Sequence, residues 1–181
     1  MATVSKNDPD CVSTNKIIFV GNVHLRNYTE NDPLHELNPA TLELVIDVIA
    51  PPSYEFVAFH DIVLILELVE PVGAQFVEHS GRNNYFWGVP HPTLPNAWVE
   101  VGIGAPTPRL RIRTAKGNLL SGPNNGATYF VGINGVPPNG ALRLTAFASA
   151  NQVLAVASSC AVTIADLQSG DNLVGYLPPA P

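Results

Sequence analysis

Seventeen prolines divide this chain of 181 residues into short segments, and this punctuation restricts its secondary structure more than any other property. Proline fixes its own φ angle and lacks a backbone N–H, so it is poorly tolerated inside helices and central strands. No window of about a dozen residues places apolar side chains at helical spacing without a proline or glycine inside it. The segments between prolines are rich in Val, Ile, Leu, Phe and Thr, which favour strands. The sequence therefore predicts a nearly all-β protein.

Alternation with a period of two residues marks the individual strands. Residues 109–114 place Leu110 and Ile112 on one face and arginines on the other, whereas residues 62–66 are apolar on both faces. The second pattern predicts a central strand that is covered on both sides. The predicted strands span residues 16–25, 42–50, 56–70, 75–79, 85–88, 98–103, 109–114, 127–133, 141–149 and 152–164. The last two are expected to form a hairpin that turns at Ala150 and Asn151.

Eight to ten short strands separated by turn residues are typical of a sandwich or a barrel. We predict an antiparallel β-sandwich, either immunoglobulin-like or jelly-roll, formed by a single domain over residues 16–169. Residues 1–15 are expected to form an N-terminal arm. Residues 170–181 are expected to form a proline-rich C-terminal tail, ending in polyproline II conformation.

The C-terminal third carries a family resemblance. An Asn139-Gly140 turn precedes the alternating residues 141–149, and residues 153–164 follow as a second strand. This arrangement resembles the last two strands of immunoglobulin-like and fibronectin type III domains. The resemblance implies a sandwich fold and assigns no functional residue, because the cysteine pair and tryptophan of true immunoglobulin domains are missing.

The distribution of charge excludes one class of function. The net charge is −6, whereas nucleic-acid binding requires a basic face, so we expect no nucleic-acid partner. Residues 28–100 hold eleven acids and one base, and residues 101–143 hold five bases and no acid. We expect these two stretches to lie side by side and to pair their charges.

Residues 83–98 are the best candidate for a binding site. They place four aromatic rings among prolines and asparagines, and aromatic side chains are typical anchors of interfaces. Prolines stiffen such a loop and lower the entropy cost of binding. The predicted site residues are Tyr85, Phe86, Trp87, His91, Asn96 and Trp98. In the alternative interpretation, Phe86 and Trp98 belong to the core and the prolines merely shape a crossing loop.

A row of arginines forms a second candidate. Arg109, Arg111 and Arg113 share one face of a strand, where three guanidinium groups can bind an anion. The alternative, which we favour, is that the row pairs with acids on neighbouring strands and stabilises the sheet. The candidate acids are Glu43, Asp47, Glu67 and Glu100.

Motifs for metal, cofactor and nucleophilic chemistry are missing from the sequence. Cys11 and Cys160 are far apart and form no CxxC pair, so they are either two thiols or one disulfide. The histidines lack metal-site spacing and the glycines lack a phosphate-binding fingerprint, so neither metal nor cofactor is expected. The histidines are His24, His35, His60, His79 and His91.

We therefore expect a non-catalytic sandwich that binds a protein or carbohydrate partner, or assembles with copies of itself as a homo-oligomer. Only 13% of the residues are charged, which suits a surface that is covered by a partner. One alternative is a structural subunit of a capsid, tail or other large assembly. Another is a β-sandwich or barrel lyase, cyclase or hydrolase with a cleft of acids and histidines. No apolar run reaches the roughly 18 residues of a membrane helix, so we expect no membrane contact and, unless a signal was removed, a cytoplasmic protein.

Overall fold

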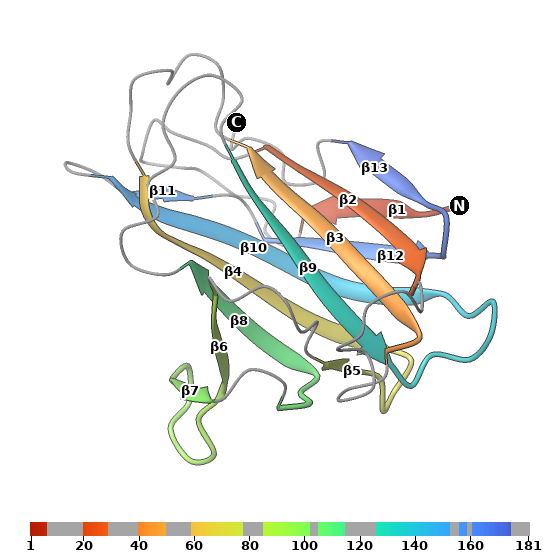
Figure 1. The fold of residues 1–181 in the computed structure, drawn as a ribbon, viewed down its shortest axis with the longest axis horizontal. Coiled ribbons are helices and arrows are strands. Elements are labelled where there is room, and N and C mark those ends of the chain that lie inside the picture. Colours follow the sequence, from red (N-terminus) through yellow and green to blue (C-terminus); the bar gives the residue numbers. More distant parts are fainter. Residues whose placement is uncertain are drawn as a thin grey trace.

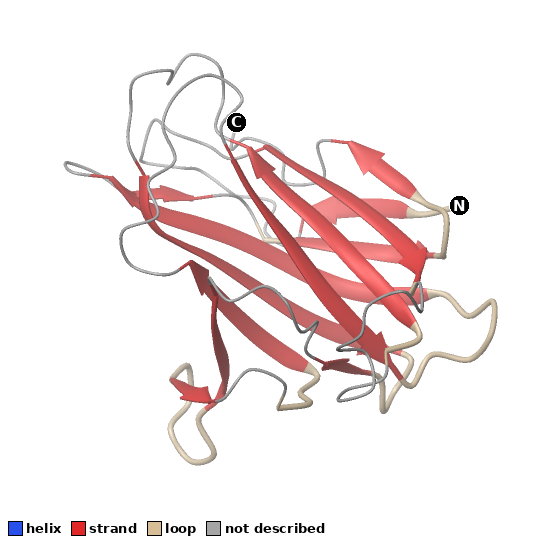
Figure 2. Cartoon of the chain, viewed as in Figure 1, coloured by secondary structure: helices blue, strands red, loops and turns tan. Residues whose placement is uncertain are grey.

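The computed structural model describes residues 1–6, 20–28, 40–49, 59–77, 85–101, 105–114, 126–152, 156–158 and 161–174. Within these residues there is no helix, and all strand pairs are antiparallel. The strands form two sheets that pack against each other (Figures 1 and 2). The predicted antiparallel β-sandwich is therefore confirmed. The described residues contain no helix of the length and apolar character needed to cross a membrane.

The larger sheet has eight strands, in the order β1-β12-β10-β4-β8-β6-β7, with β11 also paired to β10. The central pair, β10 and β4, makes the longest ladder, and the β6–β7 hairpin forms one edge of the sheet (Figure 1). The bounds are β1 Thr3–Lys6, β4 Phe59–Glu70, β6 Tyr85–Pro90, β7 Trp98–Val101, β8 Arg109–Thr114, β10 Leu142–Gln152, β11 Val156–Ser158 and β12 Val162–Leu167.

The smaller sheet has five strands, in the order β13-β2-β3-β9-β5. Its edge strand β5 is tied to the segment before β8 in the other sheet, because Phe76 and Thr107 exchange two backbone hydrogen bonds of 2.8 and 3.1 Å. The bounds are β2 Val20–Asn27, β3 Leu42–Ile49, β5 Gln75–Val77, β9 Gly126–Asn134 and β13 Asn172–Val174.

One apolar core lies between the sheets and follows the predicted alternation. Leu44 and Ile46 of β3 belong to the same apolar cluster as Leu64 and Leu66 of β4, and all four side chains are fully buried. Leu110 and Ile112 of β8 are buried as expected, as are the even-numbered residues 142–148 of β10. Removing this apolar surface from water is the main term that holds the two layers together.

The strand over 59–70 is central, as predicted, but its second face is not fully covered. Leu64 and Leu66 are buried, whereas Val63 and Ile65 on the outer face are half-buried. Ile65 has Phe147 of β10 and Arg111 of β8 as its cross-strand neighbours. Flanking side chains from the same sheet therefore shield this apolar face.

The turn of the predicted C-terminal hairpin was placed at the wrong residues. Ala150 and Asn151 lie within β10, opposite Ala157 and Val156 of β11. The single strand expected over 152–164 is two strands, since β11 and β12 pair with successive parts of β10. Sequence alternation could not locate the break, because small and apolar residues continue through residues 153–161.

Both ends of the chain contribute strands outside the expected domain range of 16–169. Residues 3–6 of the expected arm form β1 on β12, and residues 172–174 of the expected tail form β13 on β2. Cys11, Cys160 and residues 175–181 lie outside the described residues.

Candidate functional site

Strands β8, β6 and β7 bring most of the predicted site residues onto the outer face of the larger sheet. Arg113 lies opposite Phe86, and Arg111 lies opposite Gly88, which in turn lies opposite Glu100. Two residues further along β6, Pro90 lies opposite Trp98. Because side chains at alternate positions share a face, this register aligns the arginine row with the aromatic rings. We call this surface the hairpin face: Phe86, Trp98, Glu100, Arg109, Arg111 and Arg113.

The guanidinium groups lie over the rings of the hairpin face. The guanidinium carbons of Arg109 and Arg111 are 5.0 and 5.7 Å from the ring centre of Trp98. The guanidinium carbon of Arg113 is 4.5 Å from the ring centre of Phe86, whose exposed fraction is 39%. Each contact is within the range of cation–π attraction, about 0.5–1 kcal/mol at exposed sites. The two candidate sites predicted separately from the sequence therefore form one surface.

Acids of β4 and β7, which lie on either side of β8, pair with the arginines, as the uneven charge distribution predicted. Glu100 Oε1 accepts hydrogen bonds from Arg113 Nη2 at 2.6 Å and from Arg113 Nε at 3.2 Å, and lies 3.7 Å from Arg111 Nη2. Arg109 Nε lies 3.8 Å from Glu67 Oε2. The charge pairing expected for Glu67 and Glu100 is thus present.

The other two acids proposed as arginine-row partners belong to the smaller sheet. Glu43 forms an ion pair with Arg26, its direct cross-strand neighbour, and is almost completely buried. Asp47 accepts a hydrogen bond of 2.7 Å from Thr128. Pairing of these acids with the arginine row was therefore a wrong prediction, because the two sheets present their outer faces in opposite directions.

Gly88 is a residue of this site that sequence reasoning missed. A Cβ atom at this position would come within 3.3 Å of Arg111 Nε and of the Arg111 carbonyl oxygen. Because Gly88 has no side chain, the side chain of Arg111 has room to cross β6 towards Trp98 and Glu100. A glycine inside a predicted strand is the signal for such a close approach.

Trp87 does not belong to the binding surface, contrary to the prediction. Its exposed fraction is 5%, it packs in the core cluster, and its Nε1–H donates a hydrogen bond of 3.0 Å to the Ala105 carbonyl. Adjacent residues in a strand point to opposite faces, so the exposure of Phe86 requires the burial of Trp87. The competing interpretation, with Phe86 and Trp98 in the core, is wrong for the same reason. The side chain of Tyr85 lies outside the described residues.

The loop over residues 91–97, which joins β6 to β7, is held by the side chain and backbone of His91. The Nδ1 atom accepts hydrogen bonds from the backbone N–H groups of Thr93 and Leu94 at 3.1 and 3.0 Å, so it is unprotonated in this arrangement. The His91 N–H donates to the Ala97 carbonyl at 2.9 Å, and Asn96 takes a left-handed conformation with φ of 58°. His91 therefore braces the loop, while Leu94 and Asn96 are exposed at its tip.

A pocket of about 510 Å³ opens at the end of the sandwich, apart from the hairpin face. Among the described residues that line it there is no acid, histidine, lysine or arginine. Among the residues that the structure describes, no group of three or more His, Cys, Asp or Glu side chains is placed to hold a metal ion.

No family model and no curated protein matches this chain.

Proposed function

We propose that this chain is a non-catalytic β-sandwich that binds a protein partner through the hairpin face and the adjoining loop over residues 91–97. The observation that carries the proposal is the position of Phe86 and Trp98. Both rings lie on the outer face of an edge hairpin, and arginines of the neighbouring strand hold them there.

The composition of this surface supports a protein partner. Tryptophan and arginine dominate the residues that contribute most to binding energy at protein interfaces. Ion pairs and ring contacts already order the side chains, so they lose little conformational freedom on binding. The braced loop between β6 and β7 adds Leu94, with an exposed fraction of 57%, as a further apolar side chain.

A protein fits this face better than a carbohydrate does. A sugar stacks on a bare aromatic ring, whereas here guanidinium groups lie over both Trp98 and Phe86. The guanidinium groups of this face favour a partner surface that presents a carboxylate or several carbonyl oxygens.

Self-assembly is the second candidate, and the edge position of the hairpin favours it. Among the described strands β7 is the last of its sheet, so its outer backbone groups are placed to pair with another strand. A second copy of the chain would supply such a strand. In contrast, the described lining of the pocket at the end of the sandwich includes no acid or histidine, and so lends no support to the lyase, cyclase or hydrolase alternative.

The proposal is tested by site-specific photo-crosslinking. A benzophenone amino acid replaces Leu94 at the loop tip. As a matched control, the same amino acid replaces Val174, an 81%-exposed residue of β13, which is an edge strand of the smaller sheet. Both proteins are irradiated in an extract of the cells that naturally produce the chain, and also in purified form. We expect a discrete crosslinked species from position 94 and none from position 174.

The same experiment with Trp98→Ala decides whether the hairpin face is responsible. Loss of the crosslink, with unfolding of the variant shifted by no more than about 1 kcal/mol, supports the proposal. A crosslinked dimer of the purified protein identifies the partner as a second copy, and light scattering then gives the size of the assembly. Equal crosslinking at both positions, no crosslinking, or an unchanged crosslink in Trp98→Ala would refute the proposal.

A further inference from the structure

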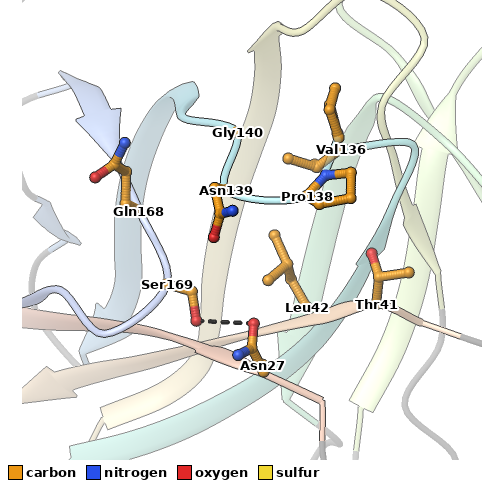
Figure 3. Close-up of a pocket in the computed structure, with 10 residues that line it drawn as sticks. Asn27, Thr41, Leu42, Val136, Pro138, Asn139, Gly140, Gln168 and Ser169 are labelled. Atoms are coloured by element: carbon orange, nitrogen blue, oxygen red, sulfur yellow. Dashed lines mark hydrogen bonds between the residues drawn. The ribbon is translucent and has the colours of Figure 1, made fainter.

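The pocket at the end of the sandwich gathers polar side chains from segments that are far apart in the sequence. Asn27 ends β2, Thr41 precedes β3, Asn139 belongs to the loop between β9 and β10, and Gln168 and Ser169 follow β12 (Figure 3). The volume of about 510 Å³ is within the usual range for small-molecule sites, roughly 300–1,000 Å³.

Two turns hold the walls of the pocket. In the β9–β10 loop the Gly140 N–H donates to the Pro137 carbonyl at 2.8 Å, and two consecutive prolines stiffen the chain. In the β12–β13 loop the Gln168 N–H donates to Asp171 Oδ2 at 2.8 Å. Because these bonds come from the backbone and from Asp171, the carboxamides of Asn139 and Gln168 are not required to close either turn.

The backbone conformation of Asn139 sets the direction of its side chain. Its φ angle is 57°, in the left-handed region, and its carboxamide points into the space beside Ser169 and Leu42 (Figure 3). Across this space Ser169 Oγ donates a hydrogen bond of 3.0 Å to Asn27 Oδ1, which fixes the orientation of the second carboxamide. The apolar residue Leu42 thus lies among two carboxamides, those of Asn27 and Asn139, and two hydroxyl groups, those of Ser169 and Thr41.

We propose that this pocket binds a short neutral saccharide. Amide and hydroxyl groups both donate and accept hydrogen bonds, as the hydroxyl groups of a sugar do. Val136, Pro137 and Pro138 supply apolar surface against which the C–H groups of a sugar ring pack. This site shares no residue with the hairpin face, so its function is independent of the protein-binding function proposed above.

The lining also disfavours the two competing classes of ligand. An anionic ligand would lose water without meeting a cation in the described lining, which includes no lysine, arginine or histidine. An extended peptide binds by backbone pairing, and the consecutive residues Pro137 and Pro138 remove two N–H donors from the wall.

The test is a titration of the isotope-labelled, full-length protein followed by amide and carboxamide NMR signals. The probes are maltotriose, cellotriose and chitotriose as neutral saccharides, trigalacturonate as an anionic one, and an uncharged, doubly capped tetrapeptide. We expect at least one neutral trisaccharide to shift the signals of Asn27, Asn139, Gly140 and Ser169 at millimolar concentration. Absence of these shifts with all three neutral saccharides, or tighter binding of trigalacturonate or the tetrapeptide, would overturn the proposal.

A matched pair of variants separates ligand contact from loop folding. Asn139→Gly removes the carboxamide, while glycine adopts the same left-handed backbone without strain. Asn96→Gly makes the identical change at the other exposed left-handed asparagine, in the 91–97 loop. We expect Asn139→Gly to weaken saccharide binding about tenfold and Asn96→Gly to leave it unchanged. Equal effects of the two variants, or none from Asn139→Gly, would contradict the assignment.

Discussion

The hairpin face and the pocket hold their side chains in place by different means. On the hairpin face the side chains hold one another: Glu100 joins Arg111 and Arg113, and the arginines lie over the rings. In the pocket the backbone turns do this work, through the Gly140–Pro137 bond and the left-handed conformation of Asn139.

Because of this difference, the effects of a substitution on stability and on binding are harder to separate on the hairpin face than in the pocket. A substitution on the hairpin face removes a partner contact and an internal contact together, so both properties change. Substitution of the Asn139 carboxamide, which is not required to close its turn, removes only hydrogen-bonding capacity directed at a ligand. A surface built from mutually paired side chains is thus harder to dissect by mutation than one built on rigid turns.

The largest expected effect distinguishes the two tryptophans of the hairpin. Trp87→Ala leaves a cavity in the core and should lower the free energy of unfolding by about 3–5 kcal/mol. Trp98→Ala should lower it by only about 1 kcal/mol, since that ring lies on the outer face. Urea unfolding of both variants measures the difference. Equal losses would mean that Trp98 is a core residue and that the hairpin face is misassigned.

A smaller effect is expected from reversing one charge of the row. Arg111→Glu places a second carboxylate beside Glu100, which lies 3.7 Å from Arg111 Nη2, and should lower the free energy of unfolding by about 1 kcal/mol. Arg111→Met keeps the apolar stem without the charge and should cost less. Thermal unfolding compares the two. An unchanged melting temperature of Arg111→Glu would favour an anion-binding role for the row.

Salt should affect the two sites unequally. Raising the salt concentration from about 0.05 M to about 0.5 M screens the arginines of the hairpin face, and should reduce the crosslink yield at position 94 severalfold. Saccharide binding in the pocket should stay constant, because the described residues of its lining carry no charge. Titrations at both salt concentrations compare the sites. A salt-sensitive pocket would contradict the choice of a neutral ligand.

The smallest expected effect concerns stability at the left-handed asparagines. Asn139→Gly should change the free energy of unfolding by no more than about 0.5 kcal/mol, and Asn96→Gly by a similar amount. Differential scanning calorimetry can resolve a larger change. A loss well above this value for Asn139→Gly would show that the carboxamide holds its own loop, as the side chains of the hairpin face hold one another.

Several parts of the fold could be predicted from local patterns. Prolines and two-residue alternation predicted strands in their observed positions, such as β8 over Arg109–Thr114, and predicted which β3 side chains enter the core. The opposite charge of residues 28–100 and 101–143 predicted ion pairs that the structure contains, including Arg113–Glu100. No pattern in the sequence indicated that the strand predicted over residues 152–164 is divided into β11 and β12.

The candidate sites depended on information that local patterns lack. Alternation requires Phe86 and Trp87 to face opposite ways, but only the packing of β6 against the core decides that Trp87 is inside. Gly88 acquires its role only because Arg111 lies opposite it.

For this protein, periodicity and charge distribution were sufficient to predict strands, layers and electrostatic pairing, because those properties arise from neighbours along a strand and from the sign of whole segments. Which ring is exposed and which loops enclose a pocket were decided only by tertiary structure. The bond between Ser169 and Asn27, 142 residues apart in sequence, illustrates the reason. Sites of this kind form where distant turns meet, and that meeting depends on how the two sheets stack.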